Sequence, residues 1–286
     1  MTPTELVNHC KKEGLTTIAI TDHDTVDHIE EAMDAGRSAG VDVFTGTELT
    51  VEFGGVEMVH LLAYDFDEKN KELCDYLKKF QVERDDRSRK MIANLQKLGL
   101  KISWEELQSR VAGVATKRHV KNLVYEKADN LEILQRLGVA SPEEFSKKLT
   151  ARGKPADPGE WKKIDLAEAV KLVKGAGGSC SIAHPAYSFR QYAKDHPDYL
   201  AELKMLGVDA IEVFYGFHTK EEAEYLFAKA KELKMSMTAG SDFHEFYDPF
   251  CQGVGRWNTY GLIESQHLKW DFFSGFLGIG GLSIHD

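Results

Sequence analysis

The sequence has few cysteines, no apolar run long enough to cross a membrane and no secretory leader pattern. Its four cysteines are scattered without a close pair, at Cys10, Cys74, Cys180 and Cys251. This spacing indicates neither a zinc ribbon nor a small disulfide framework. A membrane-spanning helix needs about 18 to 20 consecutive apolar residues, and no segment approaches that length. These absences predict a soluble protein of the reduced cytoplasm.

Positive charge is also scarce, since 36 Lys and Arg residues face 46 Asp and Glu residues, giving a net charge of −10. Such a chain is not suited to broad electrostatic binding of duplex nucleic acid, although a local basic pocket can still hold phosphate. We therefore expect neither duplex DNA nor a membrane as a partner. With 286 residues, 42% of them hydrophobic, the chain is long enough for one large domain or a domain carrying an insertion.

Short β-rich runs alternate with helical patterns in two parts of the chain. The predicted strands are 16–21, 41–45, 59–64, 179–183, 209–214 and 235–239, and the predicted helices are 3–12, 26–39, 164–175, 198–206 and 219–234. This alternation is typical of an α/β fold. Polar residues follow the strands, as in a βα barrel, but a doubly wound sheet would also place its site there. The strand count does not decide between them.

No good strand pattern occurs between residues 67 and 160, where the chain is charged and helical. Ser103-Trp104-Glu105-Glu106 and Ser141-Pro142-Glu143-Glu144 are typical helix starts. The organisation we predict is therefore an α/β domain made of 1–66 and 160–265, a helical insertion at 67–159, and a tail of uncertain structure at 266–286.

Potential metal ligands follow several of these strands. The first are in Thr21-Asp22-His23-Asp24, and the others are Glu48, His60, His184, Asp242 and His244. Taken alone, each has an ordinary explanation, such as a helix cap or a surface histidine. Their shared position after different strands favours convergence on one polynuclear metal site. Asp24 we interpret instead as the cap of the helix that starts near Val26.

Five short motifs occur in order along the chain: Ile20-Thr21-Asp22-His23-Asp24, Gly46-Thr47-Glu48, His60-Leu61-Leu62-Ala63-Tyr64, Ala183-His184-Pro185 and Gly240-Ser241-Asp242-Phe243-His244. In order and spacing they resemble the motifs of the PHP (polymerase and histidinol phosphatase) phosphoesterases, across almost the whole chain. The helical insertion and the segment 211–218 most resemble the branch that contains nucleoside 3′,5′-bisphosphate phosphatases and 5′-to-3′ exoribonucleases.

The resemblance implies a distorted seven-stranded βα barrel, similar to a TIM barrel, with a helical insertion domain and up to three divalent metals. Carried over residue by residue, it makes His23, Glu48, His60, His184, Asp242 and His244 the metal ligands, with Glu48 bridging. Mixed imidazole and carboxylate ligands suit Mn²⁺, Fe²⁺ or Zn²⁺ rather than Ca²⁺, and we expect Mn²⁺. His218 and Asp242 are the candidate catalytic residues; His218 would assist the leaving group or hold phosphate, or would be only a helix-capping histidine.

The resemblance also implies that the insertion caps the barrel mouth and supplies phosphate-binding cations. The candidates are Arg87, Arg118, His119, Arg152 and Lys154, for which the alternative is a solvated helix face. Such cations would recognise a second phosphate. The predicted function is metal-dependent hydrolysis of a phosphomonoester on a nucleotide, such as a nucleoside 3′,5′-bisphosphate, or on the end of a short single-stranded RNA. Histidinol phosphate is an alternative substrate.

PHP enzymes begin with a strand ending in His-x-His and a loop carrying an Asp, neither of which is found here. The sequence therefore predicts a barrel without its first strand. An incomplete gene product, a catalytically impaired metal- or phosphate-binding module, and replacement of the strand by another segment all remain open. For the last, the candidate is Leu282-Ser283-Ile284-His285-Asp286.

Overall fold

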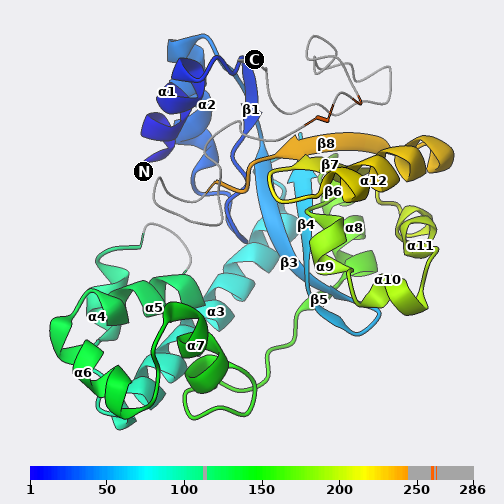
Figure 1. Ribbon diagram of the computed structural model, residues 1–286. Helices are drawn as coiled ribbons and strands as arrows, with labels where there is room; N and C mark the ends of the chain where they lie inside the picture. The colour runs from blue at the N-terminus through cyan, green and yellow to red at the C-terminus, as the bar shows by residue number, and fades with distance from the viewer. Residues whose placement is uncertain (112–114, 244–258, 261, 263–286) are drawn as a thin grey trace. The chain divides into compact units, whose positions relative to one another are not determined.

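The computed structural model describes residues 1–111, 115–243, 259–260 and 262 (Figure 1). The chain divides into two compact units. One contains Met1–Cys74 and the described residues from Lys163 onwards, and the other is Asp75–Lys162. His244, the tail 266–286 and its His285 lie outside the described residues, so predictions about them are not addressed by the structure.

The first unit opens with a two-stranded parallel sheet and two helices. Strand β1 (Thr17–Ala19) pairs with β2 (Asp42–Phe44), and α1 (Pro3–Lys12) packs on α2 (Ile29–Ala39). The hydroxyl of Thr2 accepts a hydrogen bond from the backbone of Glu5 and completes a capping box, so α1 begins where the sequence predicts. Helix α2 begins later than predicted, after a loop that contains the first candidate ligand.

A six-stranded sheet forms the centre of this unit, in the order β5-β3-β4-β6-β7-β8. Its strands are β3 (Gly46–Phe53), β4 (Val56–Tyr64), β5 (Ile164–Asp165), β6 (Ser179–Ile182), β7 (Ala210–Tyr215) and β8 (Ser236–Gly240). Strand β4 runs antiparallel to both β3 and β6, whereas the other pairs are parallel. The fold is therefore mixed α/β with a central sheet.

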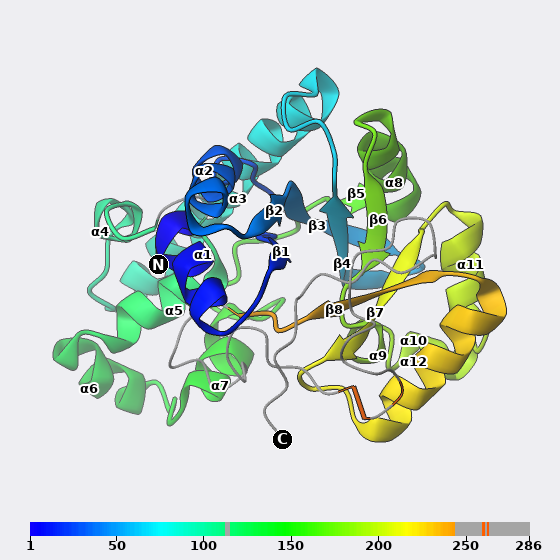
Figure 2. The same cartoon turned by 90° about the horizontal axis from the view of Figure 1, so that it is seen from above.

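Helices α8 (Leu166–Gly175) and α12 (Lys220–Leu233) pack on this sheet, α8 against β6 and α12 against β7 and β8 (Figure 2). The shorter helices are α9 (Pro185–Ser188), α10 (Tyr192–Asp195) and α11 (Tyr199–Met205). Apolar residues of α8 and α12 that face the strands are fully buried, among them Val173 and Leu226. This burial supplies the hydrophobic free energy that holds the helices on the sheet.

The two sheets are joined through one residue pair, His23 and Glu48, which form an isolated parallel bridge. The N–H of Glu48 donates to the carbonyl of Asp22 at 3.1 Å, and the N–H of Asp24 donates to the carbonyl of Glu48 at 2.9 Å. The segment after β1 therefore continues the pairing onto β3. Closure of the strands into a barrel, and the absence of a first strand, remain predictions.

Two local expectations are wrong. Glu48 lies inside strand β3, which was not predicted, instead of in a loop after a strand, whereas His60 lies in β4, as the predicted strand 59–64 implies. Asp24 does not cap α2, whose N-cap position is His28 without a side-chain hydrogen bond. Asp24 has a left-handed φ of 52° and is fully buried against Thr50. Its carboxylate accepts hydrogen bonds from the strand residue Thr50 rather than from the N–H groups at a helix end.

The regular elements in the described part of the second unit are all helices. It contains most of α3 (Lys71–Lys97), then α4 (Trp104–Gln108), α5 (Lys117–Tyr125), α6 (Ala128–Arg136), α7 (Pro142–Phe145) and a π-helical turn at Ser146–Thr150. Its own core includes Leu95, Trp104, Leu123 and Phe145. Ser103, Thr116 and Ser141 cap three of the helices. The predicted domain boundaries themselves remain predictions.

Among the described residues, no helix is both long and apolar enough to cross a membrane. The described cysteines, Cys10, Cys74 and Cys180, form no disulfide, as their spacing in the sequence indicates.

Candidate metal centre

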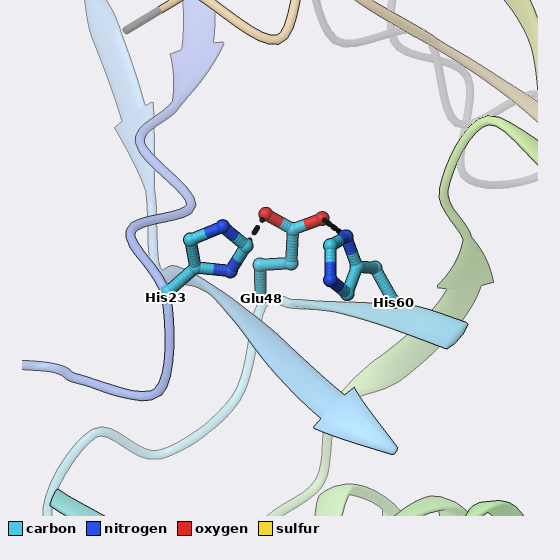
Figure 3. A group of neighbouring side chains, drawn as sticks. All are labelled: His23, Glu48 and His60. Atoms are coloured by element: carbon cyan, nitrogen blue, oxygen red, sulfur yellow. Dashed lines mark ion pairs between the residues drawn. The ribbon is translucent and has the colours of Figure 1, made fainter. Parts of the chain in front are cut away.

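Glu48 lies between two histidines at the centre of the candidate site (Figure 3). Its Oε2 is 3.2 Å from Nδ1 of His23, and its Oε1 is 3.0 Å from Nδ1 of His60. The strand register explains this, because Thr50 on β3 is opposite His60 on β4. Glu48 and Thr50 point to the same face of β3, so His60 is a diagonal neighbour of Glu48.

His184 joins the cluster from the end of β6. Its Nε2 lies 3.3 Å from Nδ1 of His60 and 3.9 Å from Oε1 of Glu48, while its Nδ1 is 3.0 Å from the hydroxyl of Ser188. The residue has left-handed dihedrals, with φ 32° and ψ 55°, at the N-cap of α9. Pro185 follows at the first helical position, where its fixed φ suits a helix start. The backbone turn directs the ring toward β4.

The charges of the cluster depend on one another. Burial opposes ionisation of Glu48, but the adjacent imidazoles of His23 and His60 outweigh it and hold the Glu48 pKa well below its usual range. Burial alone would lower the pKa of His60, but the negative charge of Glu48 raises it. Burial, followed by the proximity of His60, lowers the pKa of His184 to about 4. The site thus combines a carboxylate with a neutral imidazole at neutral pH.

Asp242 follows β8, as predicted, and accepts a hydrogen bond from the hydroxyl of Tyr215 at 3.3 Å. Its charge is close enough to contribute to the raised pKa of His60. Like His184, it has a left-handed backbone, with φ 49°. These observations place Asp242 near the cluster; its predicted partner His244 lies outside the described part of the chain.

His218 is buried at the end of β7, where its ring lies 5.2 Å from the ring of Tyr215. Its Nδ1 is 3.0 Å from the carbonyl of Val213, and its Nε2 is buried without a hydrogen-bond partner among the described residues. Burial lowers the pKa of His218, which favours the neutral ring. It does not cap α12, because Thr219 does so with Glu222. The alternative of a helix-capping histidine is therefore wrong.

The cluster fits a divalent metal ion by its chemistry. One ligand atom from each of His23, Glu48 and His60 can be chosen so that all lie within 4.8 Å of one another. The Nε2 atom of His60 is buried and neither accepts nor donates a hydrogen bond within the described residues. Burying a polar atom in this way costs free energy unless another group binds it. Imidazole nitrogens with a carboxylate form a donor set for Mn²⁺, Fe²⁺ or Zn²⁺.

Comparison with known proteins shows what the chain is similar to. Its residues 1–136 match the family model of the PHP domain. It is 26% identical over 274 residues to a 5′-3′ exoribonuclease of Haemophilus influenzae, covering 96% of this chain and 94% of that protein. It is 25% identical over 279 residues to a 3′,5′-nucleoside bisphosphate phosphatase of Chromobacterium violaceum, covering 90% of each.

A solved structure from Bifidobacterium adolescentis, described as a metal-dependent phosphoesterase, is 26% identical and superposes with a TM-score of 0.69, covering 89% of this chain and 85% of that one. The prediction of a PHP-type hydrolase is confirmed by these relatives.

Sequence reasoning missed two supporting residues of the candidate site. Asp24 accepts hydrogen bonds from the backbone and hydroxyl of Thr50, beside the candidate ligands. Glu212, in the middle of β7, accepts the backbone N–H of His184 at 2.8 Å, and burial raises its pKa to about 8. The sequence signal for Glu212 is a lone acidic residue inside the apolar run Ala210–Tyr215, since a buried acid needs a specific partner.

The predicted phosphate-binding cations belong to the second unit. Arg87 donates to the carbonyl of Gly159, and its guanidinium lies 5.2 Å from the ring of Trp161. His119 accepts the N–H of Thr116 at 3.2 Å, within the capping box of α5. The remaining candidates lie on α5 and after the π-helical turn. Arg118 is in the first turn of α5, Arg152 pairs with Glu160 at 2.8 Å, and Lys154 is exposed. Phosphate binding by these five residues stays a prediction.

Proposed function

We propose that this chain hydrolyses a phosphomonoester on a nucleotide, such as a nucleoside 3′,5′-bisphosphate, or on the end of a short RNA, in a metal-dependent reaction. The observation that carries the proposal is the buried carboxylate of Glu48 between the imidazoles of His23 and His60, with His184 next to them. The exoribonuclease and the bisphosphate phosphatase to which the chain is similar support this substrate class. They do not favour an impaired binding module over an enzyme.

In this proposal His23, Glu48, His60, His184, Asp242 and His244 hold up to three divalent ions, with Mn²⁺ the expected metal. Bound ions of this kind offset the charge of phosphoryl oxygens and lower the pKa of a water molecule. Burial of the cluster strengthens each electrostatic interaction, because little water screens it.

His218 is proposed to move a proton at its Nε2. The Nδ1 nitrogen is engaged by the carbonyl of Val213, so this contact fixes the tautomer in which Nε2 carries the lone pair. A neutral ring can accept a proton from water, and a ring protonated beside a bound phosphate can donate one to the leaving oxygen. Asp242, oriented by Tyr215, is the second proposed catalytic residue.

Arg87, Arg118, His119, Arg152 and Lys154 are proposed to bind a second phosphate. Guanidinium groups suit this task because they present paired N–H donors to phosphate oxygens. A second phosphate distinguishes a bisphosphate or an RNA end from a simple monoester.

The test uses the full chain, purified and supplied with Mn²⁺, against four substrates: a nucleoside 3′,5′-bisphosphate, a short 5′-phosphorylated RNA, histidinol phosphate and an aryl phosphate. We expect release of phosphate or mononucleotide from the first two, and its loss in Glu48→Gln. Release from histidinol phosphate alone would overturn the substrate class, and no release from any substrate would overturn the enzymatic function. Glu52→Gln, on the same strand, is the matched control.

A further inference from the structure

Glu212 is a carboxyl group buried in the sheet beside the candidate metal centre. It lies in β7, a strand whose six residues are all buried, and is itself only 4% exposed. Its Oε2 accepts the backbone N–H of His184 at 2.8 Å. A buried carboxyl is costly without such a partner, so its retention in an otherwise apolar strand calls for a local role.

His184 is the residue on which this carboxyl acts. Its φ of 32° and ψ of 55° are left-handed, which residues with a side chain rarely adopt unless the surroundings hold them there. Glu212 holds the backbone N–H and Ser188 lies at hydrogen-bond distance from Nδ1. Together these contacts leave Nε2 as the nitrogen that faces Glu48 and His60.

Gly240 provides the space for the Glu212 carboxyl group. A Cβ atom at position 240 would lie 2.1 Å from Oε1 of Glu212, closer than any real contact. Gly240 is not among the residues with a left-handed φ, so its backbone would accept alanine, and the carboxyl group explains why glycine is needed. Gly240 ends β8 two residues before Asp242. Glu212 therefore lies between the segments that carry His184 and Asp242.

We propose that Glu212 is a positioning residue of the metal centre. Its carboxyl oxygen holds the backbone of His184 in the left-handed conformation that presents Nε2 to the metal, and Gly240 leaves the room for it. The inference rests on the proposed function only in requiring that the cluster bind a divalent ion. The inference explains why Glu212 and Gly240 occupy these positions, although neither residue is a candidate metal ligand.

The experiment measures Mn²⁺ affinity by titration calorimetry, turnover, and the melting temperature of the metal-free protein in four variants. Glu212→Gln keeps an acceptor oxygen and is expected to retain affinity and turnover within about threefold. Glu212→Ala removes it and should weaken Mn²⁺ binding by about 10- to 100-fold, as loss of a residue that orients a ligand does. Gly240→Ala should match Glu212→Ala, and the double variant Glu212→Ala/Gly240→Ala should be no worse than either single one, because the space is then vacant.

Gly178→Ala is the matched control, because its added Cβ would also crowd a neighbour, lying 2.8 Å from Cβ of Phe66, but away from the candidate ligands. It should lower the melting temperature and leave Mn²⁺ affinity unchanged. Equal affinity in Glu212→Ala and the wild type, an equal loss in Glu212→Gln and Glu212→Ala, or additive losses in the double variant would each overturn the role of Glu212. A wild-type chain that binds Mn²⁺ but hydrolyses no substrate overturns the proposed function alone, since the affinity series still tests the inference.

Discussion

The carboxylate of Asp24 accepts two hydrogen bonds from Thr50, one from the backbone N–H at 2.9 Å and one from the hydroxyl at 3.0 Å. Both residues are fully buried. Because the N–H of Asp24 also donates to the carbonyl of Glu48, the loop carrying His23 is attached to β3 by backbone and side chain together. The distance between His23 and Glu48 depends on this attachment.

Replacing Thr50 with valine should therefore destabilise the protein. The substitution keeps the shape of the side chain but removes the hydroxyl that donates to the buried Asp24 carboxylate. A buried acceptor that loses its partner costs about 1 to 3 kcal/mol. Urea unfolding of Thr50→Val should show a lower midpoint with an unchanged slope, whereas Thr50→Ser, which keeps the hydroxyl, should lose much less. Equal midpoints for valine and the wild type would contradict this account of Asp24.

Glu48→Gln is expected to abolish strong metal binding without unfolding the protein. Glutamine has nearly the same shape as glutamate but lacks the charge that contacts His23 and His60. We expect Mn²⁺ affinity to fall by about tenfold or more. Metal content after gel filtration measures the effect. The control Glu52→Gln changes the same strand and should keep its metal; retention of metal by Glu48→Gln would remove Glu48 from the ligand set.

Local signals explain which parts of the fold were predictable. Helices α1 and α12 begin where capping boxes start them, and these boxes involve residues three apart in sequence. Strand β3 was missed because Glu48 and Thr50 give its site face a polar pattern, although both are buried. The turn that follows, Gly54 and Gly55 with φ of 57° and 83°, is a hairpin signal that the sequence does contain.

The site shows the same division between local and tertiary information. His23 and His184 stand out in the sequence because each follows an apolar run. The roles of Asp24 and Glu212 do not follow from such local signals, because their partners, Thr50 and the backbone of His184, are 26 and 28 residues away. Those partners depend on strand register and on a left-handed turn, neither of which a single sequence specifies.

Arg87 and Arg152 should respond differently to replacement by alanine if both bind substrate phosphate. Arg87 contacts Gly159 and Trp161, so Arg87→Ala should raise the KM for a bisphosphate and also lower the melting temperature. Arg152 is exposed and pairs with the exposed Glu160 at 2.8 Å, a kind of ion pair that contributes at most about 1 kcal/mol. Arg152→Ala should therefore raise KM with little change in stability. An unchanged KM in either variant would remove that arginine from the phosphate-binding set.

Metal affinity should increase with pH. The raised pKa of His60 means that this imidazole keeps its proton to higher pH than an ordinary histidine, and a metal ligand must release that proton. His184, with a pKa lowered to about 4, is already neutral near pH 6 and imposes no such competition. Mn²⁺ titrations from about pH 6 to pH 8.5 should show affinity still rising above 6.5, the ordinary histidine pKa. An affinity that is constant over this range would contradict protonation of His60 in the metal-free protein.

His218 allows the proton-transfer role to be separated from its packing role, because its two nitrogens have different surroundings. Nδ1 contacts the carbonyl of Val213, whereas Nε2 is buried without a partner among the described residues. The amide nitrogen of asparagine can take the place of Nδ1, so His218→Asn should fold normally and keep its metal but lose Nε2. Loss of a general acid or base lowers kcat by about 10²- to 10⁴-fold, and we expect a fall in this range with little change in KM.

The control is His218→Gln, whose amide better mimics Nε2. This variant should lose the Val213 contact and melt at a lower temperature. If His218→Asn instead raises KM at constant kcat, His218 binds the phosphate, and its place is in substrate recognition rather than in proton transfer.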